Sequence, residues 1–351
     1  MTLLVQRWPR LSAIPHAPLG RFPTPLEVGT KLSAVVGAEV SIKRDDLTGE
    51  LYGGNKVRKL EYLLGQALAE GADTIVTTGA VGSHHVLATA LYGARHGFEV
   101  HGMLMPQVRT PHVEKNARAM LAAGATLHPI SSFAMFPGAL AALIAKLRLQ
   151  KKRLFVIGPG GSDAAGVLGY VEAGLELGQQ LLRVEVREPD AIYVALGTGG
   201  TAAGLAVGLA AAGVMAEIVA VRVTPRALIR KGMLSTLTRG LVQKLRGMTD
   251  RFPGVADIAM KNLTIEEGFL GEGYGIATGA GREAARVVEE TEGLVLDGSY
   301  TGKTMAALIA HARGARRGQR LIYVHTLSSA PMQPLLEGAP PLPKRIEALM
   351  R

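Results

Sequence analysis

Lys56 is the first residue whose type and position indicate chemistry. It follows two glycines and Asn55, close to the start of a helix that we predict over residues 58–70. The positive end of a helix dipole disfavours an ammonium group, so it lowers the pKa of a lysine placed there. The neutral amine is the form that adds to a carbonyl compound to give a Schiff base. Taken alone, the same lysine could also do no more than cap a surface helix.

A glycine-rich turn in ALGTGGTAAGLAVGL, residues 195–209, is the second candidate. The pattern predicts a strand, then the turn Gly197, Thr198, Gly199, Gly200 and Thr201, then a helix of small residues. Such a turn offers unhindered backbone N–H groups to a phosphate at a helix N-terminus. It is no Walker loop and fits the dinucleotide fingerprint only loosely. Tight packing between strand and helix is the alternative explanation.

The third segment, TTGAVGSHHVLATA at residues 77–90, predicts a strand that ends in small residues before Ser83, His84 and His85 open a helix. A hydroxyl, an imidazole and free N–H groups at that point can hold a carboxylate. Helix capping by Ser83 is the alternative. Neighbouring histidines on a helix point apart and no HExxH pattern is present, so we expect no metal site.

Two tyrosines and a threonine complete the candidates. Tyr274 in GYGIAT and Tyr300 in SYTGK stand in glycine-rich contexts, where a phenol could serve in proton transfer or could equally pack on a loop. Thr326 follows an apolar run, at the strand end where α/β sheets display functional groups.

Apolar runs and amphipathic patterns alternate along the chain. The predicted strands are 74–78, 100–105, 154–157, 191–196, 218–223 and 321–325. The predicted helices are 58–70, 84–96, 113–123, 163–183, 201–212, 281–292 and 301–313. This βα order implies a mainly parallel sheet covered on both faces. Glycine clusters at 49–54 and 158–161 suggest that four βα passes form a lobe of their own, with a ligand held between lobes.

Composition narrows the classes of protein. The 351 residues include no cysteine, which excludes disulfides and thiolate chemistry and favours a cytoplasmic protein. The net charge of +10 is spread over separate basic clusters without interleaved aromatics, so we expect a solvated basic face and no nucleic acid. The uncharged stretch 191–216 is interrupted by glycines, which favours a strand, a loop and a buried helix over a membrane span. The N-terminus has no signal-peptide pattern.

Seven motifs in this order resemble the D-cysteine desulfhydrase and 1-aminocyclopropane-1-carboxylate (ACC) deaminase family: GGNKVRKLEYLL, GAVGSHH, GPGGSDAAGVLGYVEA, GTGGTAAG, GYGIAT, SYTGK and HT. The resemblance spans Phe22 to Ser329. It implies the tryptophan-synthase β-like fold of pyridoxal phosphate (PLP) enzymes, a two-lobed three-layer α/β sandwich with mainly parallel sheets. Residues 1–55 and 175–351 would form a large cofactor-binding domain, and residues 56–174 a small α/β domain.

The same resemblance implies roles for the candidate residues. Lys56 would form the Schiff base with PLP. The cofactor-binding set would be Asn55, Lys56, His84, Gly197, Thr198, Gly199, Gly200, Thr201 and Thr326. The substrate-binding set would be Ser83, His84, His85, Tyr274 and Tyr300. The catalytic set would be Lys56, Ser83, Tyr274 and Tyr300.

Two departures from the family pattern bear on the substrate. His84 stands where an asparagine is usual, and a cationic imidazole there would change the pKa of the Schiff base. HTLSS replaces the common HTGG, and Thr301 after Tyr300 resembles the desulfhydrase branch more than the deaminase branch. We therefore expect α,β-elimination from a small amino acid such as D-cysteine in a cytoplasmic homodimer. The alternatives are ACC ring opening, racemisation or sulfonate elimination, and a non-catalytic binder of a phosphometabolite or RNA.

Overall fold

The computed structural model describes residues 1–182 and 188–350, which contain two β-sheets flanked by helices. The larger sheet has six strands in the order β1 (Leu26–Val28), β2 (Glu39–Lys43), β10 (Arg320–Val324), β7 (Ala191–Leu196), β8 (Glu217–Arg222) and β9 (Leu263–Glu266). Only the β1–β2 pair of this sheet is antiparallel. The smaller sheet is wholly parallel, in the order β5 (Thr126–Pro129), β4 (Glu99–Met105), β3 (Thr74–Ala80) and β6 (Leu154–Ile157).

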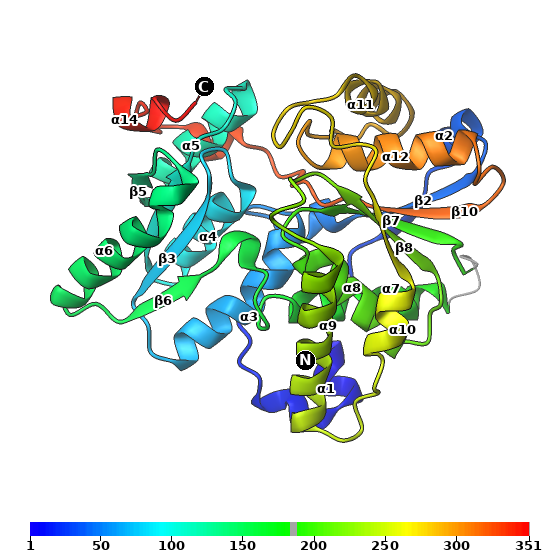
Figure 1. Ribbon diagram of the computed structural model, residues 1–351, viewed down its shortest axis with the longest axis horizontal. Helices are drawn as coiled ribbons and strands as arrows, with labels where there is room; N and C mark the ends of the chain where they lie inside the picture. The colour runs from blue at the N-terminus through cyan, green and yellow to red at the C-terminus, as the bar shows by residue number, and fades with distance from the viewer. Residues whose placement is uncertain (183–187, 351) are drawn as a thin grey trace.

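Helices cover both faces of the larger sheet, as Figure 1 shows. One face packs against α2 (Thr30–Val36), α11 (Gly279–Glu292) and α12 (Thr301–Arg313). The other face packs against α7 (Leu168–Leu181), α8 (Gly200–Ala211), α9 (Lys231–Met248) and α10 (Ala256–Lys261), with α1 (Leu3–Arg7) beside α7. The strand β7, Ala-Ile-Tyr-Val-Ala-Leu, is apolar throughout because a strand inside a covered parallel sheet has no solvent face.

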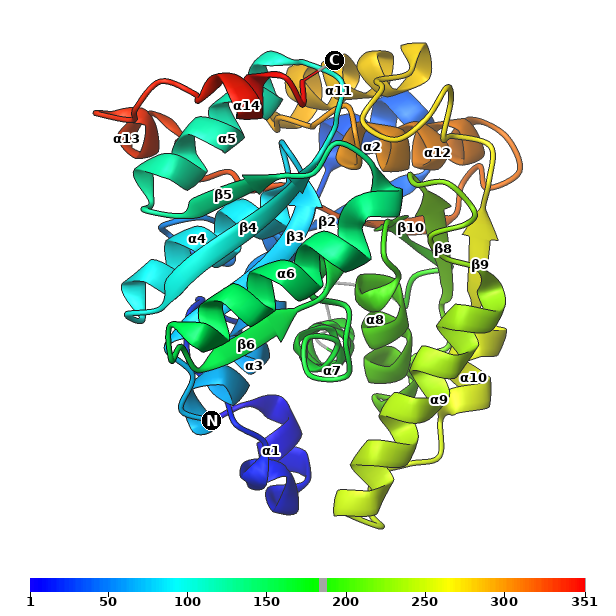
Figure 2. The same cartoon turned by 60° about the vertical axis from the view of Figure 1, so that its left-hand side comes forward.

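The smaller sheet is also a middle layer. Helices α3 (Asn55–Ala69), α4 (His84–Arg95) and α5 (Pro111–Ala122) share one apolar cluster with it, and α6 (Phe136–Leu149) packs on the opposite face (Figure 2). Near the C-terminus, α13 (Gln333–Leu336) contacts α5 and α14 (Lys344–Glu347) contacts β5. Residues 1–182 and 188–350 also contain four short 3-10 turns: η1 (Pro9–Ala13), η2 (Asp45–Leu47), η3 (Phe133–Met135) and η4 (Pro159–Gly161).

The six predicted strands and the mainly parallel sheets are confirmed, and four short strands, β1, β2, β5 and β9, escaped prediction. The helix predicted over 163–183 was wrong at its start, because the Asp163 carboxylate accepts N–H bonds from Ala165 and Gly166 in a turn before α7 begins; residue 183 lies outside the described residues. The stretch 191–216 is β7 followed by buried α8, as predicted. Among the described residues, no helix is long and apolar enough to cross a membrane.

The strands of the smaller sheet all lie within residues 56–174, and those of the larger sheet lie outside that range. The boundary at 174/175 falls inside α7, which packs against α8. The division into a domain of residues 1–55 and 175–351 and a domain of residues 56–174 remains a proposal.

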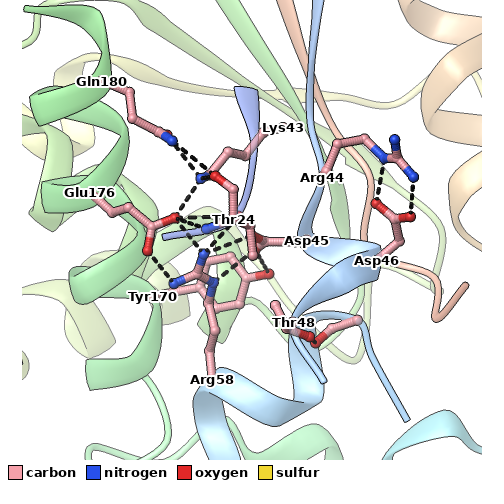
Figure 3. Close-up of polar contacts among 11 residues, drawn as sticks. Thr24, Lys43, Arg44, Asp45, Asp46, Thr48, Arg58, Tyr170, Glu176 and Gln180 are labelled. Atoms are coloured by element: carbon pink, nitrogen blue, oxygen red, sulfur yellow. Dashed lines mark hydrogen bonds and ion pairs between the residues drawn. The ribbon is translucent and has the colours of Figure 1, made fainter. Parts of the chain in front are cut away.

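A buried network of charges fastens α3 to the larger sheet (Figure 3). The Arg58 guanidinium donates to both oxygens of Asp45 at 2.8 and 3.0 Å, and to both oxygens of Glu176 at 2.8 and 3.1 Å. Lys43 of β2 also bonds to Glu176, and the Tyr170 hydroxyl donates to Asp45 at 2.7 Å. Because Lys56 is the second residue of α3, two residues before Arg58, this network fixes where the Lys56 backbone lies.

Candidate active site

Helix α3 begins against the loop that follows β10. Gly54 is its N-terminal cap with φ +87°, and a Cβ there would lie 2.5 Å from the Thr326 carbonyl oxygen. The Asn55 N–H donates to that same oxygen at 3.2 Å. Glycine is therefore required at position 54 both by the left-handed backbone and by the close approach. The contact places Thr326 beside the start of the helix.

Lys56 is linked to the glycine turn through Asn55. The Lys56 ammonium donates to Asn55 Oδ1 at 2.8 Å, and Asn55 Nδ2 donates to Thr201 Oγ1 at 3.1 Å. Burial lowers the pKa of Lys56 to about 8, against the opposing field of Asp297. The direction agrees with the sequence-based expectation, but desolvation is the leading cause. With a pKa of about 8, roughly a tenth of this amine is neutral at pH 7, a far larger share than for an ordinary exposed lysine.

The glycine turn opens α8 directly after β7. Gly199 caps the helix with φ +89° and no side chain caps the first turn, so its amides are left for another acceptor. A Cβ on Gly200 would lie 2.6 Å from Ser162 Oγ, and one on Gly160 would lie 2.6 Å from Thr198 Oγ1. The turn thus lies directly against the Gly158–Ser162 loop, and only small residues fit between them.

Ser83 and His84 begin α4, at the carboxyl end of β3. Ser83 Oγ accepts the Val86 N–H at 3.3 Å, which is the capping contact that the sequence left as the alternative interpretation. His84 bonds on both ring nitrogens: Nδ1 with the Tyr52 hydroxyl, and Nε2 with His112 Nε2 at 2.9 Å. Burial and the neighbouring His112 lower the pKa of His84 to about 3. The His84 ring is therefore neutral, so the effect considered for a cationic imidazole does not arise here.

His85 points in a different direction from its neighbour. Its ring is buried, with Nε2 3.0 Å from Thr77 Oγ1 and Cε1 near Gly161. Burial, aided by Lys56 and Lys59, lowers its pKa well below the usual value, so it too is neutral. The structure therefore separates the two rings, and the substrate-binding role of His85 stays a prediction.

The two predicted tyrosines lie together. The hydroxyls of Tyr274 and Tyr300 are 2.8 Å apart, and a Cβ on Gly197 would lie 3.3 Å from the Tyr300 ring. Tyr300 also faces His84, with ring centroids 6.4 Å apart. Burial raises the pKa of both phenols, so both stay protonated. One cluster therefore contains the glycine turn, both tyrosines and His84.

Asp297 is an anion that the sequence analysis missed. Its carboxylate accepts N–H bonds from Ser299 and Tyr300 at 2.7 Å each, and the Thr301 hydroxyl at 2.7 Å. Burial acts to raise the pKa of Asp297, but the hydrogen bonds from Thr301 and Tyr300 bring it below its usual value. Its position three residues before Tyr300, at the start of α12, is a capping pattern that could have revealed it.

The comparisons with known proteins agree with this arrangement. Residues 18–326 match the family described as pyridoxal-phosphate dependent enzyme. The chain is 35% identical over 322 residues to a D-cysteine desulfhydrase of Salmonella choleraesuis, covering 90% of this chain and 94% of that protein. The chain belongs to the pyridoxal-phosphate dependent enzyme family. The expected cofactor is thereby confirmed as PLP.

Solved structures of similar fold also support the assignment to this family. A crystal structure of an ACC deaminase homologue superposes with a TM-score of 0.78 and 30% identity, over 96% of this chain and 99% of that one. The processed form of threonine deaminase isoform 2 from Solanum lycopersicum has a TM-score of 0.61 at 18% identity, over 99% and 88% of the two chains, and shares the fold alone. These likenesses confirm the predicted tryptophan-synthase β-like α/β fold with mainly parallel sheets.

The residues present fit PLP. A phosphate dianion suits the uncapped first turn of α8, where glycines keep Cβ atoms away from the amides. The Lys56 amine, of lowered pKa, lies two hydrogen bonds from that turn, which suits an aldehyde carried on the same molecule as the phosphate. The donor set therefore matches both ends of the cofactor.

Proposed function

We propose that this enzyme is a lyase that performs α,β-elimination on a small amino acid resembling D-cysteine, giving pyruvate, ammonia and sulfide. The observation that carries the proposal is the link from Lys56 through Asn55 to Thr201 of the glycine turn. The 35% identity to a D-cysteine desulfhydrase along 90% of the chain supports the choice of substrate.

We propose the following roles around the cofactor. PLP, when bound, supplies an aldehyde that condenses with amines and a ring that accepts the electrons left when the α proton departs. The turn from Gly197 to Thr201 holds the phosphate, and Asn55 orients Lys56. Thr326 would lie near the ring nitrogen of bound PLP, where a hydroxyl would not enforce protonation as a carboxylate would. His84, with a neutral ring, would contact the cofactor at an atom other than the ring nitrogen.

The reacting groups are protein side chains with shifted pKa values. The Lys56 amine, with its pKa of about 8, takes the α proton of the substrate. Ser83 keeps its hydroxyl proton while accepting the Val86 N–H, so it can donate to the substrate carboxylate. Tyr274 and Tyr300 share one hydrogen bond and leave the second phenol proton for the substrate. We also propose the expected substrate-binding role for His85, whose buried ring contacts Thr77.

The decisive experiment loads the purified protein with PLP and records its visible absorption spectrum. We expect a band from cofactor joined to Lys56, its loss in Lys56→Ala, and its retention in the control Lys344→Ala, which removes an exposed lysine. Pyruvate and ammonia should then form from D-cysteine. Absence of the band in the unmodified protein would rule out the proposed role of Lys56.

ACC ring opening to 2-oxobutanoate and ammonia is the second candidate, favoured by the structural likeness to an ACC deaminase homologue. Thr301 weighs against it, because its hydroxyl is engaged with Asp297 and offers no carboxylate to the site. Measuring keto-acid release from ACC and from D-cysteine separates the two, and the same screen covers racemisation and sulfonate elimination. Retention of RNA that is lost with salt, without any PLP band, would instead indicate the non-catalytic binder.

We further propose, by analogy with the family, that the enzyme is a homodimer, and from its lack of cysteine that it works in the cytoplasm. Sedimentation of the PLP-loaded protein tests the first statement. A fluorescent fusion in the source cell tests the second.

A further inference from the structure

Three side chains form a hydrogen-bonded row from the candidate active site to the first turn of α5. The Tyr52 hydroxyl meets His84 Nδ1, and His84 Nε2 lies 2.9 Å from His112 Nε2. Tyr52 is buried, whereas His84 and His112 are partly accessible. The two histidines follow β3 and β4, whose carboxyl ends are neighbours in the smaller sheet.

Asn116 determines which way the protons of this row point. Its Nδ2 donates to the Gly82 carbonyl at 2.9 Å and also lies 3.3 Å from His112 Nε2. An amide NH₂ only donates, and the flipped amide would set oxygen against the Gly82 oxygen. His112 Nε2 must therefore accept, which leaves the proton of that ring on Nδ1. His84 then donates from Nε2, and its Nδ1 accepts the Tyr52 proton.

The charges around the row favour neutral rings. His84 faces Tyr52, His112, Lys56 and Asp297, and burial with His112 lowers its pKa. Burial also lowers the pKa of His112, helped by Lys115 and opposed by Asp297. A neutral imidazole gains a proton on one nitrogen and loses one from the other without holding a lasting charge. The row is thus chemically able to pass protons.

We propose that Tyr52, His84 and His112 form a proton relay between the candidate active site and solvent. A proton taken up by the Tyr52 oxygen sends the Tyr52 proton to His84 Nδ1, the His84 Nε2 proton to His112 Nε2, and the His112 Nδ1 proton to water. One proton enters, one leaves, and every bond broken is replaced. The inference rests on the proposed function, in which a substrate ammonium must lose a proton before its amine can react.

After a proton has moved outward to water, His84 and His112 are each in the opposite tautomer. In that state they can carry a proton inward. Water then gives a proton to His112 Nδ1, the chain of transfers runs inward, and the Tyr52 proton passes to the departing β-leaving group. The starting tautomers are restored, so one proton out and one proton in complete each turnover. His112 touches no substrate in this scheme and acts through His84.

The test compares His112→Ala with a matched control from another histidine pair. His101 Nδ1 and His128 Nε2 are also 2.9 Å apart, but His101 Nε2 is engaged with Glu99, so His128→Ala removes an equivalent pair away from the row. In PLP-loaded protein we expect His112→Ala to lower kcat for pyruvate formation about tenfold or more, since a positioned proton-transfer group contributes roughly 10²–10⁴-fold. Imidazole added to the buffer should restore part of the rate. The control should keep its rate and show no rescue.

A second measurement depends on neither folding of the variant nor catalysis. Long-range ¹⁵N–¹H spectra of the full chain without cofactor should show His84 protonated on Nε2 and His112 on Nδ1. A proton on His112 Nε2 would overturn the assigned direction and the relay with it. An unchanged kcat in folded His112→Ala, or a loss that imidazole does not rescue, would also overturn it. If the protein shows these tautomers but does not turn over D-cysteine, the proposed substrate is wrong. The hydrogen-bond directions assigned to the row would still be confirmed.

Discussion

Two of the three cationic residues of helix α3, Lys56 and Arg58, lie in different surroundings. Arg58 is bonded to the carboxylates of Asp45 and Glu176, as Figure 3 shows. Lys56, two residues earlier, is bonded to the neutral amide oxygen of Asn55, with Asp297 acting on it only through its field. The same helix therefore supplies one fully paired charge and one that is not paired.

The pKa shifts follow that difference. Burial opposes charge on Arg58, but Asp45 and Glu176 outweigh it and raise the Arg58 pKa, so the guanidinium stays charged. At Lys56 burial outweighs Asp297 and the pKa falls to about 8. Paired buried charges stabilise one geometry, whereas an unpaired buried amine is a base and a nucleophile. The Arg58 network therefore stabilises the fold, whereas Lys56 is available to react.

Lys56→Met should give the largest functional effect with little loss of stability. It removes the amine and keeps an unbranched side chain of similar length without the cost of desolvating a charge, so the free energy of unfolding should stay unchanged or rise. Keto-acid formation should fall at least about 10³-fold, in the upper part of the range for a positioned proton-transfer group. Denaturant unfolding and a coupled pyruvate assay measure the two effects. A destabilised but active variant would contradict the comparison.

Arg58→Met should do the reverse and destabilise the fold by about 3–5 kcal/mol, because it leaves Asp45 and Glu176 as buried carboxylates without their main partner. The measurement is the midpoint and slope of urea unfolding. The matched control is Arg239→Met, which breaks an exposed pair with Asp257 at 3.2 Å and should cost about 0–1 kcal/mol. Equal losses for the two variants would show that the network is no stronger than a surface pair.

The reactivity of Lys56 should titrate near its lowered pKa. The rate of acetylation of Lys56 in cofactor-free protein should rise with pH to a midpoint of about 8, because only the neutral amine reacts. Mass spectrometry after competitive labelling follows the site, with exposed Lys344 as the internal standard. A midpoint near 10.5, the ordinary lysine value, would show that burial does not act on this amine.

The sequence predicted those parts of the molecule that depend on neighbours along the chain. Long apolar runs such as 191–196 identified buried strands, and Lys56 and the turn at Gly199 were recognisable because helix starts and glycine turns are local features. Strand β1 was missed because it has three residues and no buried one. Such an edge strand is defined by its pairing with β2, which a local pattern does not contain.

The rest of the site depends on contacts between distant segments. Tyr52 and His112 meet His84 across separations of 32 and 28 residues, so neither carries a signal of its own. One indirect signal existed: both histidines follow parallel strands, and the carboxyl ends of such strands share one edge. The neutrality of His84 was not predictable, because it follows from burial beside a second imidazole.

Acid should weaken the Arg58 network, because its two carboxylates lose their charge as the pH falls. Arg58 and Lys43 hold the pKa of Asp45 and of Glu176 below the ordinary 3.8 and 4.5, although burial opposes them. For carboxylates with depressed folded pKa values, the stabilisation is complete above those ordinary values and is lost as pH falls below them. Each such group changes the free energy of unfolding by up to about 1.4 kcal/mol per pH unit in that range.

Glu176→Gln tests this pH dependence. The variant should be less stable at neutral pH, because Lys43 and Arg58 lose an anionic partner, and its unfolding free energy should fall less steeply between about pH 4.5 and pH 3. Urea unfolding at a series of pH values measures both quantities. Exposed Glu283, paired with Arg286, provides the control Glu283→Gln, which should leave the steepness nearly unchanged because water already screens that pair. Equal slopes for the unmodified protein and Glu176→Gln would mean that Glu176 gains no protection of its charge from the network, and the contrast with Lys56 would then rest on Asp45 alone.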